Sequence, residues 1–173
     1  LNDVVRGNKP RGSVSIYYQN SSYDLEKPIE ILINADEKLN RSRSSDGRIA
    51  DLNNDGKKDF AVRNGVLSNG NAFFTVLYNL GNRNFSIVNF DTGIVSQTGL
   101  SDIRAGDLNS DGLTDVVVSV QEGNIVVYLQ KNNILEKNIY SSGLNSIRGL
   151  AVGDLNEDGK DDIVASSFNC LQG

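Results

Sequence analysis

Asp51-Leu-Asn-Asn-Asp-Gly-Lys-Lys-Asp59 is an acidic nonapeptide that recurs as Asp107-Leu-Asn-Ser-Asp-Gly-Leu-Thr-Asp115 and Asp154-Leu-Asn-Glu-Asp-Gly-Lys-Asp-Asp162. All three copies read D-L-N-x-D-G-x-x-D. A calcium-binding loop needs oxygen ligands at positions one, three and five, a glycine at six for a sharp turn, and further oxygens from positions seven and beyond. A single copy could equally be a metal-free turn, because Asp, Asn and Gly favour turns. Three copies in one register favour calcium.

The residues that follow each loop separate it from helical calcium-binding motifs. An EF-hand or a dockerin needs an acidic ligand at position twelve and then a helix, but here position twelve is Val62, Val118 and Ala165. Positions ten to twelve are short β-rich runs with no helical period. The loops are therefore predicted to lead into strands, at 60–62, 116–118 and 163–165.

The loops recur at a period typical of a repeat protein. Successive ninth-position aspartates, Asp3, Asp59, Asp115 and Asp162, are separated by 56, 56 and 47 residues, so residues 1–5 read as the end of a fourth copy. Strand-rich repeats of roughly 40 to 50 residues are typical of propeller blades or β-solenoids. We expect one all-β domain over 1–173, with repeats of approximately 1–50, 51–106 and 107–153 and a partial repeat at 154–173.

Each period carries three further apolar stretches besides the one after the loop. They lie at 13–18, 72–78 and 125–129, then at 29–33, 85–90 and 134–140, and last at 49–50, 103–105 and 147–152. Four strands per period predict four-stranded antiparallel blades with strands of four to seven residues and very little helix. Residues 23–43 are compatible with long loops or one helical turn, and the Ser-rich 41–47 with an exposed loop.

Composition narrows the classes of partner and compartment. The 173 residues carry a net charge of −5 and 38% hydrophobic side chains, which indicates a globular domain and speaks against nucleic acid as a partner. No apolar stretch is long enough for a membrane span, and no signal peptide is visible. Because the chain starts at Leu1 and contains no Met, we expect a processed or excised piece. The single Cys170 is predicted to be a buried or half-buried thiol and not a nucleophile, since the chain has no His to activate it.

Residues 106–118, Gly-Asp-Leu-Asn-Ser-Asp-Gly-Leu-Thr-Asp-Val-Val-Val, followed by 123–129, Gly-Asn-Ile-Val-Val-Tyr-Leu, resemble the FG-GAP repeat, also called the VCBS-type repeat. Such repeats build the β-propeller of integrin α-subunits and of many bacterial secreted proteins. The resemblance implies a propeller, commonly seven-bladed, in which each calcium loop joins two strands of one blade. Because this chain has three periods and partial ends, and both ends offer the same strand, we expect a segment of a larger propeller. Closure by association of chains is the alternative.

The resemblance also implies the ligands of three structural calcium ions. Side chains at positions one, three, five and nine and the carbonyl of position seven form each set. The sets are Asp51, Asn53, Asp55, Lys57 and Asp59; Asp107, Asn109, Asp111, Leu113 and Asp115; and Asp154, Asn156, Asp158, Lys160 and Asp162.

The function expected on this basis is a calcium-stabilised, extracellular binding or adhesion module whose propeller loops recognise a protein or a glycan. The alternative is part of a secreted polysaccharide lyase or hydrolase built on the same propeller. Against catalysis, no Ser, Cys or Lys has a recognisable activating partner. Arg104 and Arg148 could act as bases, but their recurrence before the loops indicates a structural role in the blades.

Exposed aromatic side chains are a further hint of sugar binding. The six tyrosines that could stack on sugars are Tyr17, Tyr18, Tyr23, Tyr78, Tyr128 and Tyr140. Tyr18 and Tyr78 are more consistent with the core, because Leu129 stands at the equivalent position. Tyr23 and Tyr140 are the better candidates.

Overall fold

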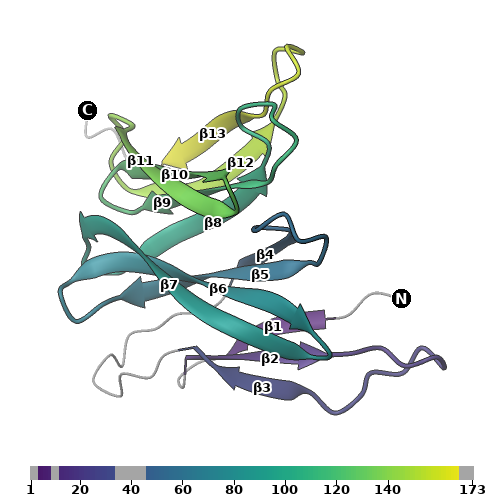
Figure 1. The fold of residues 1–173 in the computed structure, drawn as a ribbon. Helices are drawn as coiled ribbons and strands as arrows, with labels where there is room; N and C mark the ends of the chain where they lie inside the picture. Colours follow the sequence, from purple (N-terminus) through teal and green to yellow (C-terminus); the bar gives the residue numbers. More distant parts are fainter. Residues whose placement is uncertain (1–3, 9–11, 34–45, 168–173) are drawn as a thin grey trace.

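The computed structural model describes residues 4–8, 12–33 and 46–167, and these contain thirteen strands and no helix. The strands form four separate antiparallel sheets (Figure 1). The all-β prediction is confirmed. Asp3, Cys170 and most of the Ser-rich stretch at 41–47 lie outside the described residues.

The second and third sheets each have four strands, connected in sequence order. The first sheet holds β1 (Val4–Asn8), β2 (Ser13–Tyr17) and β3 (Ile29–Leu32), and the second holds β4 (Gly47–Ala50), β5 (Asp59–Val66), β6 (Asn71–Gly81) and β7 (Asn84–Val95). The third holds β8 (Leu100–Gly106), β9 (Asp115–Val120), β10 (Asn124–Lys131) and β11 (Ile134–Ser141), and the fourth holds β12 (Ile147–Gly153) and β13 (Asp162–Ser167).

The strand before each loop pairs with the strand after it. Ala50 lies opposite Asp59, Gly106 opposite Asp115 and Gly153 opposite Asp162. The second, third and fourth sheets therefore each begin one strand before the acidic loop, and the loop joins their first two strands. The apolar stretch that ends each period in the sequence is the first strand of the next sheet.

Strand length is where the sequence-based expectation is wrong. β6 and β7 have 11 and 12 residues, longer than the four to seven expected. They form one long hairpin whose register shifts between Asn71 and Phe73 and again between Asn79 and Gly81. Such bulges bend the strand and increase its local twist.

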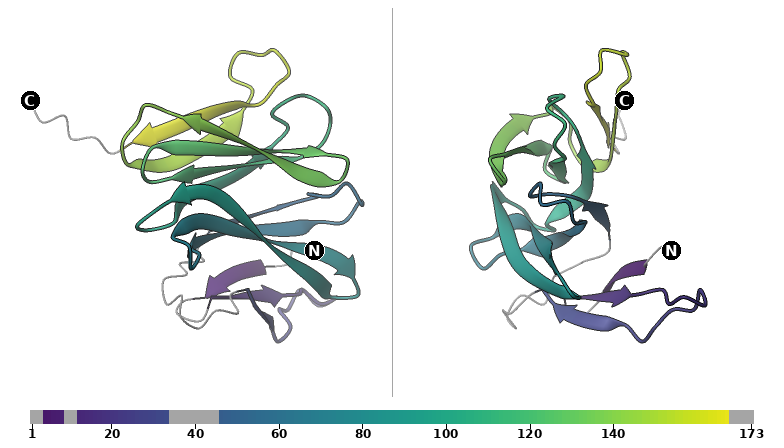
Figure 2. Two further views of the ribbon diagram at one scale, coloured as in Figure 1. Left: turned by 60° about the vertical axis from the view of Figure 1, so that its left-hand side comes forward. Right: turned by 45° about the vertical axis from the view of Figure 1, so that its right-hand side comes forward.

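The sheets stack face to face, and the core lies between them in three layers (Figures 1 and 2). One layer contains Val14 and Ile16 of the first sheet with Val62 and Leu77 of the second. The middle layer joins the second and third sheets, and the last joins the third and fourth. In the middle layer Phe74 stacks on Phe90 with ring centroids 4.9 Å apart, and both rings meet the edge of Tyr128 from the third sheet.

The first strand of each sheet lies at the centre of the stack. β8 packs beside β12 of the fourth sheet and beside β4 and β5 of the second. β11, the last strand of the third sheet, is mostly exposed at the outer edge. This is the blade arrangement of a propeller. The ring is not closed, because the first and fourth sheets lie at opposite ends of the stack (Figure 1).

Candidate metal centre

The three acidic loops lie along one side of the stack, where they join β4 to β5, β8 to β9 and β12 to β13 (Figures 1 and 2). All three adopt the same backbone conformation. Position four is left-handed, with φ of 57° at Asn54, 60° at Ser110 and 60° at Glu157, and the position-six glycines have φ of 81°, 81° and 84°. Glycine at position six avoids the strain that a side chain would bring there. The repeated sequence therefore encodes one repeated loop.

The first aspartate of each loop holds the turn together. Asp51 accepts hydrogen bonds from the backbone N–H groups of Asp55 at 3.2 Å and Gly56 at 2.8 Å. Asp107 and Asp154 make the same two bonds in their own loops. Both carboxylate oxygens of position one thus face the centre of the turn.

The amide and carboxylate at positions three and five form a second shared element. In the first loop Asn53 accepts a hydrogen bond from the backbone of Asp55 at 3.2 Å, and its amide donates to the Asp55 carboxylate at 3.2 Å. The second and third loops repeat both contacts. In the first loop only, Lys57 Nζ also lies 3.1 Å from Asp55 Oδ2. Hydrogen bonds lower the pKa of Asp55. The largest contributions come from the backbone N–H and the side chain of Lys57, and a smaller one comes from Asn53.

The ninth aspartate ties the loop to its sheet. Asp59 is 1% exposed and accepts from the backbone N–H of Leu52 at 2.9 Å and of Asn79, in the third strand, at 2.8 Å. Asp115 is 0% exposed and makes the equivalent bonds with Leu108 and Gln130. Asp162 accepts only the first of these bonds among the described residues, from Leu155 at 3.0 Å.

Negative charges within one loop act on one another. Burial raises the pKa of Asp59, its two backbone hydrogen bonds lower it, and the charges of Asp55 and Asp51 raise it further. The pKa of Asp115 responds to the same causes: burial raises it, its two backbone hydrogen bonds lower it, and the charges of Asp111 and Asp107 raise it further. A cation among these carboxylates would relieve both the repulsion and the cost of burying an ionised group.

The donor chemistry fits a hard, oxygen-seeking cation such as calcium. Each loop offers three carboxylates, one amide oxygen and the backbone carbonyl of position seven, and no nitrogen or sulfur ligand. Within the described part of the chain, no three His, Cys, Asp or Glu side chains converge closely enough to hold a metal by themselves. The amide and carbonyl oxygens would therefore complete each ligand set.

Neighbouring loops touch one another. Asp161, at position eight of the third loop, accepts a hydrogen bond from the backbone of Asp107 at 3.0 Å, and its own N–H donates to the Asp107 carbonyl at 3.2 Å. Ser110 donates to the carbonyl of Gly159. Buried Gln130 reaches from the third sheet to the carbonyl of Asp51 at 3.1 Å. The sequence analysis missed these links, because positions four and eight vary between copies.

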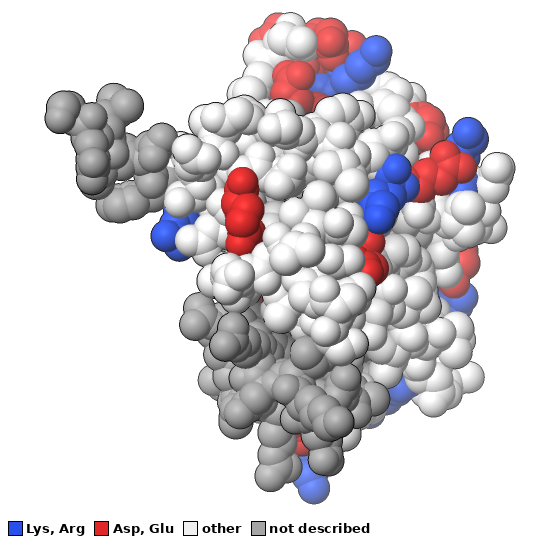
Figure 3. All heavy atoms as spheres, turned by 90° about the vertical axis from the view of Figure 1, so that its left-hand side faces the viewer, with Lys and Arg blue, Asp and Glu red and all other residues white. Residues whose placement is uncertain are grey.

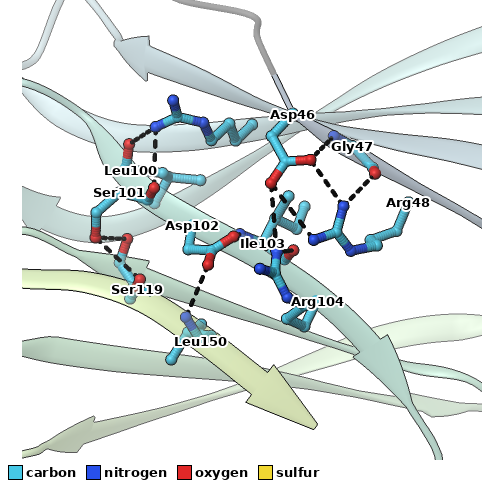
Figure 4. A network of polar contacts seen from close by, with 12 residues as sticks. Asp46, Gly47, Arg48, Leu100, Ser101, Asp102, Ile103, Arg104, Ser119 and Leu150 are labelled. Carbon is cyan, nitrogen blue, oxygen red and sulfur yellow. Dashed lines mark hydrogen bonds and ion pairs between the residues drawn. The ribbon is translucent and has the colours of Figure 1, made fainter. Parts of the chain in front are cut away.

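A second polar network lies on the central strands (Figure 4). Asp102 pairs with Arg104 on β8 and accepts a hydrogen bond from the backbone of Leu150 on β12 at 2.7 Å. Arg104 also pairs with Asp46, before β4, at 3.3 Å, and Asp46 pairs with Arg48 at 2.7 Å. Burial raises the pKa of Asp102, while its backbone hydrogen bonds lower it. The network joins the second, third and fourth sheets at their centre.

The sequence-based equivalence of Arg104 and Arg148 is wrong. Arg104 lies opposite Val117, and the matching position in the fourth sheet, opposite Val164, is Ala151. The true repeat of Arg104 is Arg48, opposite Ala61. A bulge between Ile147 and Gly149 precedes this part of β12, and the sequence gives no sign of it.

The tyrosines fall into two groups. Tyr23 and Tyr140 are exposed at 75% and 54%, as expected. Tyr128 is 2% exposed, so it cannot stack on a sugar and its candidacy is wrong. Tyr18 packs against the first core layer and lies under the guanidinium of Arg83, 4.4 Å from the ring centroid.

The comparison with known families agrees with this architecture. Residues 51–118 and 107–165 each match the family described as FG-GAP-like repeat. Each match begins at the first aspartate of one loop and ends in the strand after the next loop. No curated protein matches the chain. The two family matches together span more than half of the sequence, and the chain therefore belongs to the FG-GAP-like repeat family.

Proposed function

We propose that this protein is a calcium-stabilised, extracellular binding module without catalytic activity, and that the three acidic loops each hold one calcium ion. The observation that carries the proposal is the threefold recurrence of one loop, with the same left-handed residue, the same glycine turn and the same hydrogen bonds to positions one, three and five. Turns that bind no metal do not need the same residues and hydrogen bonds at each position. The five oxygen donors of each loop would reach the six to eight ligands of calcium with a bidentate carboxylate or water molecules.

The ions would be structural. Every carboxylate at positions one, five and nine of the loops serves the ligand set, and calcium would supply charge neutralisation at the loop centre. The protein's own part is to orient the oxygens: the N–H groups of positions five and six aim the first aspartate, and those of position two and the third strand aim the ninth. The loop is thereby fixed to the sheet.

An extracellular setting would suit calcium sites of this kind. Calcium sites of extracellular modules have dissociation constants of about 10⁻⁴ to 10⁻³ M, which suits a compartment with millimolar calcium. At a dissociation constant of about 0.1 mM, 1 mM calcium would stabilise the fold by about 1.4 kcal/mol per loop. Repeats of this family are typical of extracellular proteins, which supports the same compartment. Within the described residues there is no helix that could cross a membrane.

The ligand is a protein or a glycan, recognised by loops at one side of the propeller. Rows of loops held by a rigid sheet scaffold are a common basis for recognition. The face shown in Figure 3, on the side away from the acidic loops, carries scattered charges of both signs on its described residues.

Melting experiments on two neighbouring residues test the calcium proposal. Asp158→Asn removes the negative charge of a proposed ligand, whereas Glu157→Gln removes the same charge at the adjacent position four, which has no ligand role. We expect calcium to raise the Tm of the wild type and of Glu157→Gln by similar amounts, and magnesium to raise it little. The increase should be smaller for Asp158→Asn. If calcium changes no Tm, or if both variants respond alike, the proposal fails.

A glycan-binding screen with and without calcium then tests recognition, together with a turnover assay on uronic-acid polymers. Calcium-dependent binding without turnover is expected. Turnover would contradict the non-catalytic role.

A further inference from the structure

The second and third acidic loops are bonded directly to each other. The backbone N–H of Asp107 donates a hydrogen bond to the Asp161 carboxylate at 3.0 Å, and the N–H of Asp161 donates to the Asp107 carbonyl at 3.2 Å. The hydroxyl of Ser110 donates to the carbonyl of Gly159. One of the bonded residues, Asp107, is also the first proposed ligand of the second loop. The backbone that carries this ligand is therefore held by the neighbouring loop.

The first and second loops have no such direct bond among the described residues. They are joined through the side chain of Gln130, whose Nε2 lies 3.1 Å from the carbonyl oxygens of both Asp51 and Thr114. Gln130 belongs to the third strand of the third sheet and to neither loop. A change of conformation in one of these two loops thus reaches the other only through one side-chain amide.

Two positions of the sequence favour a direct bond in the later pair of loops. Position eight of the three loops is Lys58, Thr114 and Asp161 in turn, so the third loop alone has a carboxylate there. Gly106, just before the second loop, leaves room for this carboxylate, because a Cβ there would overlap Asp161 Oδ2 and Val152 Cγ1. The equivalent residue before the first loop is Ala50. The contact is therefore specific to this pair of repeats.

We propose that the second and third loops bind calcium cooperatively and that Asp161 is the positioning residue that couples them. This coupling rests on the calcium sites proposed above. Asp161 stands between two proposed ligands of the third loop, the carbonyl of Lys160 and the carboxylate of Asp162. An ion held by these two ligands would fix the backbone of Asp161, and the hydrogen bonds of Asp161 would then fix Asp107 in the second loop.

The coupling acts through order. A ligand that rigidifies a segment lowers the entropy cost for a second ligand that needs the same segment ordered. Here the shared segment is the bonded backbone of Asp107 and Asp161. The three carboxylates of each ligand set outweigh the two positive charges of an ion, so two loaded loops do not face each other as bare cations. Couplings between sites commonly change affinity by about 5- to 150-fold, and we expect a value near the lower end, about tenfold, from hydrogen bonds at the surface.

Thermodynamic linkage requires the effect to be mutual. Loss of the third site should weaken calcium binding in the second loop by about tenfold, and loss of the second site should weaken the third by the same factor. The second loop should respond to loss of the first site by less than about twofold, because only the Gln130 side chain joins that pair. This difference distinguishes a direct coupling from a general loosening of the fold.

Nuclear magnetic resonance of the isotope-labelled full chain can follow each loop separately during a calcium titration. The amides of Gly56, Gly112 and Gly159 donate to the first aspartate of their own loops and serve as the three reporters. Asp158→Ala removes ligand oxygens from the third loop, and Asp55→Ala removes the equivalent oxygens from the first. We expect Asp158→Ala to raise the dissociation constant reported by Gly112 about tenfold, and Asp55→Ala to raise it less than about twofold.

Variants of Asp161 test its role while all proposed ligands stay in place. Asp161→Ala should reduce the effect of Asp158→Ala on the second loop to less than about threefold, because the bond to the Asp107 N–H is lost. Asp161→Asn keeps an acceptor oxygen and should restore the coupling. Glu157→Gln is the control, since it removes a charge from the same loop at a side chain that makes no bond to the second loop in the described structure. It should leave the coupling unchanged.

The outcomes separate this proposal from the calcium proposal. If all three glycine signals respond to calcium but Asp158→Ala and Asp55→Ala change the second loop equally, the coupling is overturned and the calcium sites stand. Coupling that survives Asp161→Ala unchanged overturns the role of Asp161. Should Asp158→Ala unfold the fourth sheet, Asp111→Ala gives the reciprocal test, read at Gly159. If no glycine signal responds to saturating calcium, the calcium sites and their coupling both fail.

Discussion

At the scale of single residues, the acidic loops show how much a short pattern determines. The sequence was sufficient to predict the turn, its glycine and the candidate ligands, because each of these depends on local chemistry that recurs in three copies. It could not reveal that Asp59 and Asp115 are buried and bonded to the third strand, since that contact spans 15 to 20 residues and depends on register. Tyr128 was misjudged for the same reason.

The ammonium group of Lys57, inside the first loop, should weaken calcium binding there. Lys57 Nζ lies beside the Asp55 carboxylate, whereas the second loop has Leu113 at that position. Replacing Lys57 by Leu should tighten calcium binding to the first loop by about two- to fivefold, the modest effect of an exposed ion pair. Lys58→Leu removes the same charge one residue later and serves as the control. Calorimetric titration of both variants measures the difference, and equal affinities would refute the competition.

Calcium stabilisation should grow with pH. Burial raises the pKa of Asp59 and Asp115, so in the calcium-free protein these groups stabilise the fold below their ordinary pKa of about 4 and lose that contribution as pH rises through the folded value. Bound calcium would hold both groups ionised and reverse the trend. We expect the gap in Tm between calcium-loaded and calcium-stripped protein to widen from about pH 4 to pH 7. Carboxyl groups outside the loops affect both forms equally, so their contribution cancels in this Tm difference. A Tm difference that stays constant with pH would contradict the account.

At the scale of strands and sheets, repetition made most of the fold predictable. The four apolar stretches of each period all lie in strands, because alternation and β-branched residues report a half-buried sheet directly. Strand ends, bulges and the phase of the sheets were not predictable, since they depend on which strand pairs with which. The pairing of Ala50 with Asp59 shows that the second sheet starts with the strand before its loop, and no local signal in the sequence marks this start.

Close packing between the second and third sheets predicts a strong effect of one methyl group. Gly99 and Gly70 both have φ of 85°, but a Cβ on Gly99 would overlap the backbone of Gly65, whereas on Gly70 it would meet only Val95, at 3.8 Å. Gly70→Ala should cost about 1 to 2 kcal/mol from backbone strain alone. Gly99→Ala should cost clearly more, because β8 must move away from the second sheet. Denaturant unfolding of the pair measures the excess, and equal losses would show that the overlap relaxes freely.

At the scale of the whole molecule, stability comes from layers between sheets and not from one central core. Each layer needs both of its sheets, so an end sheet with one uncovered face is the expected weak point of an open stack. From the recurrence of the loops the sequence predicted repeated sheets, and the described sheets form an open stack. It could not show which side chains meet in each layer, because those contacts join residues of different repeats.

The central claim, that three equivalent loops hold calcium, is tested most directly by diffraction from crystals grown with calcium. The account predicts one ion in each loop with six or seven oxygen ligands, including the carbonyls of Lys57, Leu113 and Lys160. Anomalous density should identify the ion in all three loops. Water in place of an ion in these loops at saturating calcium would contradict the account.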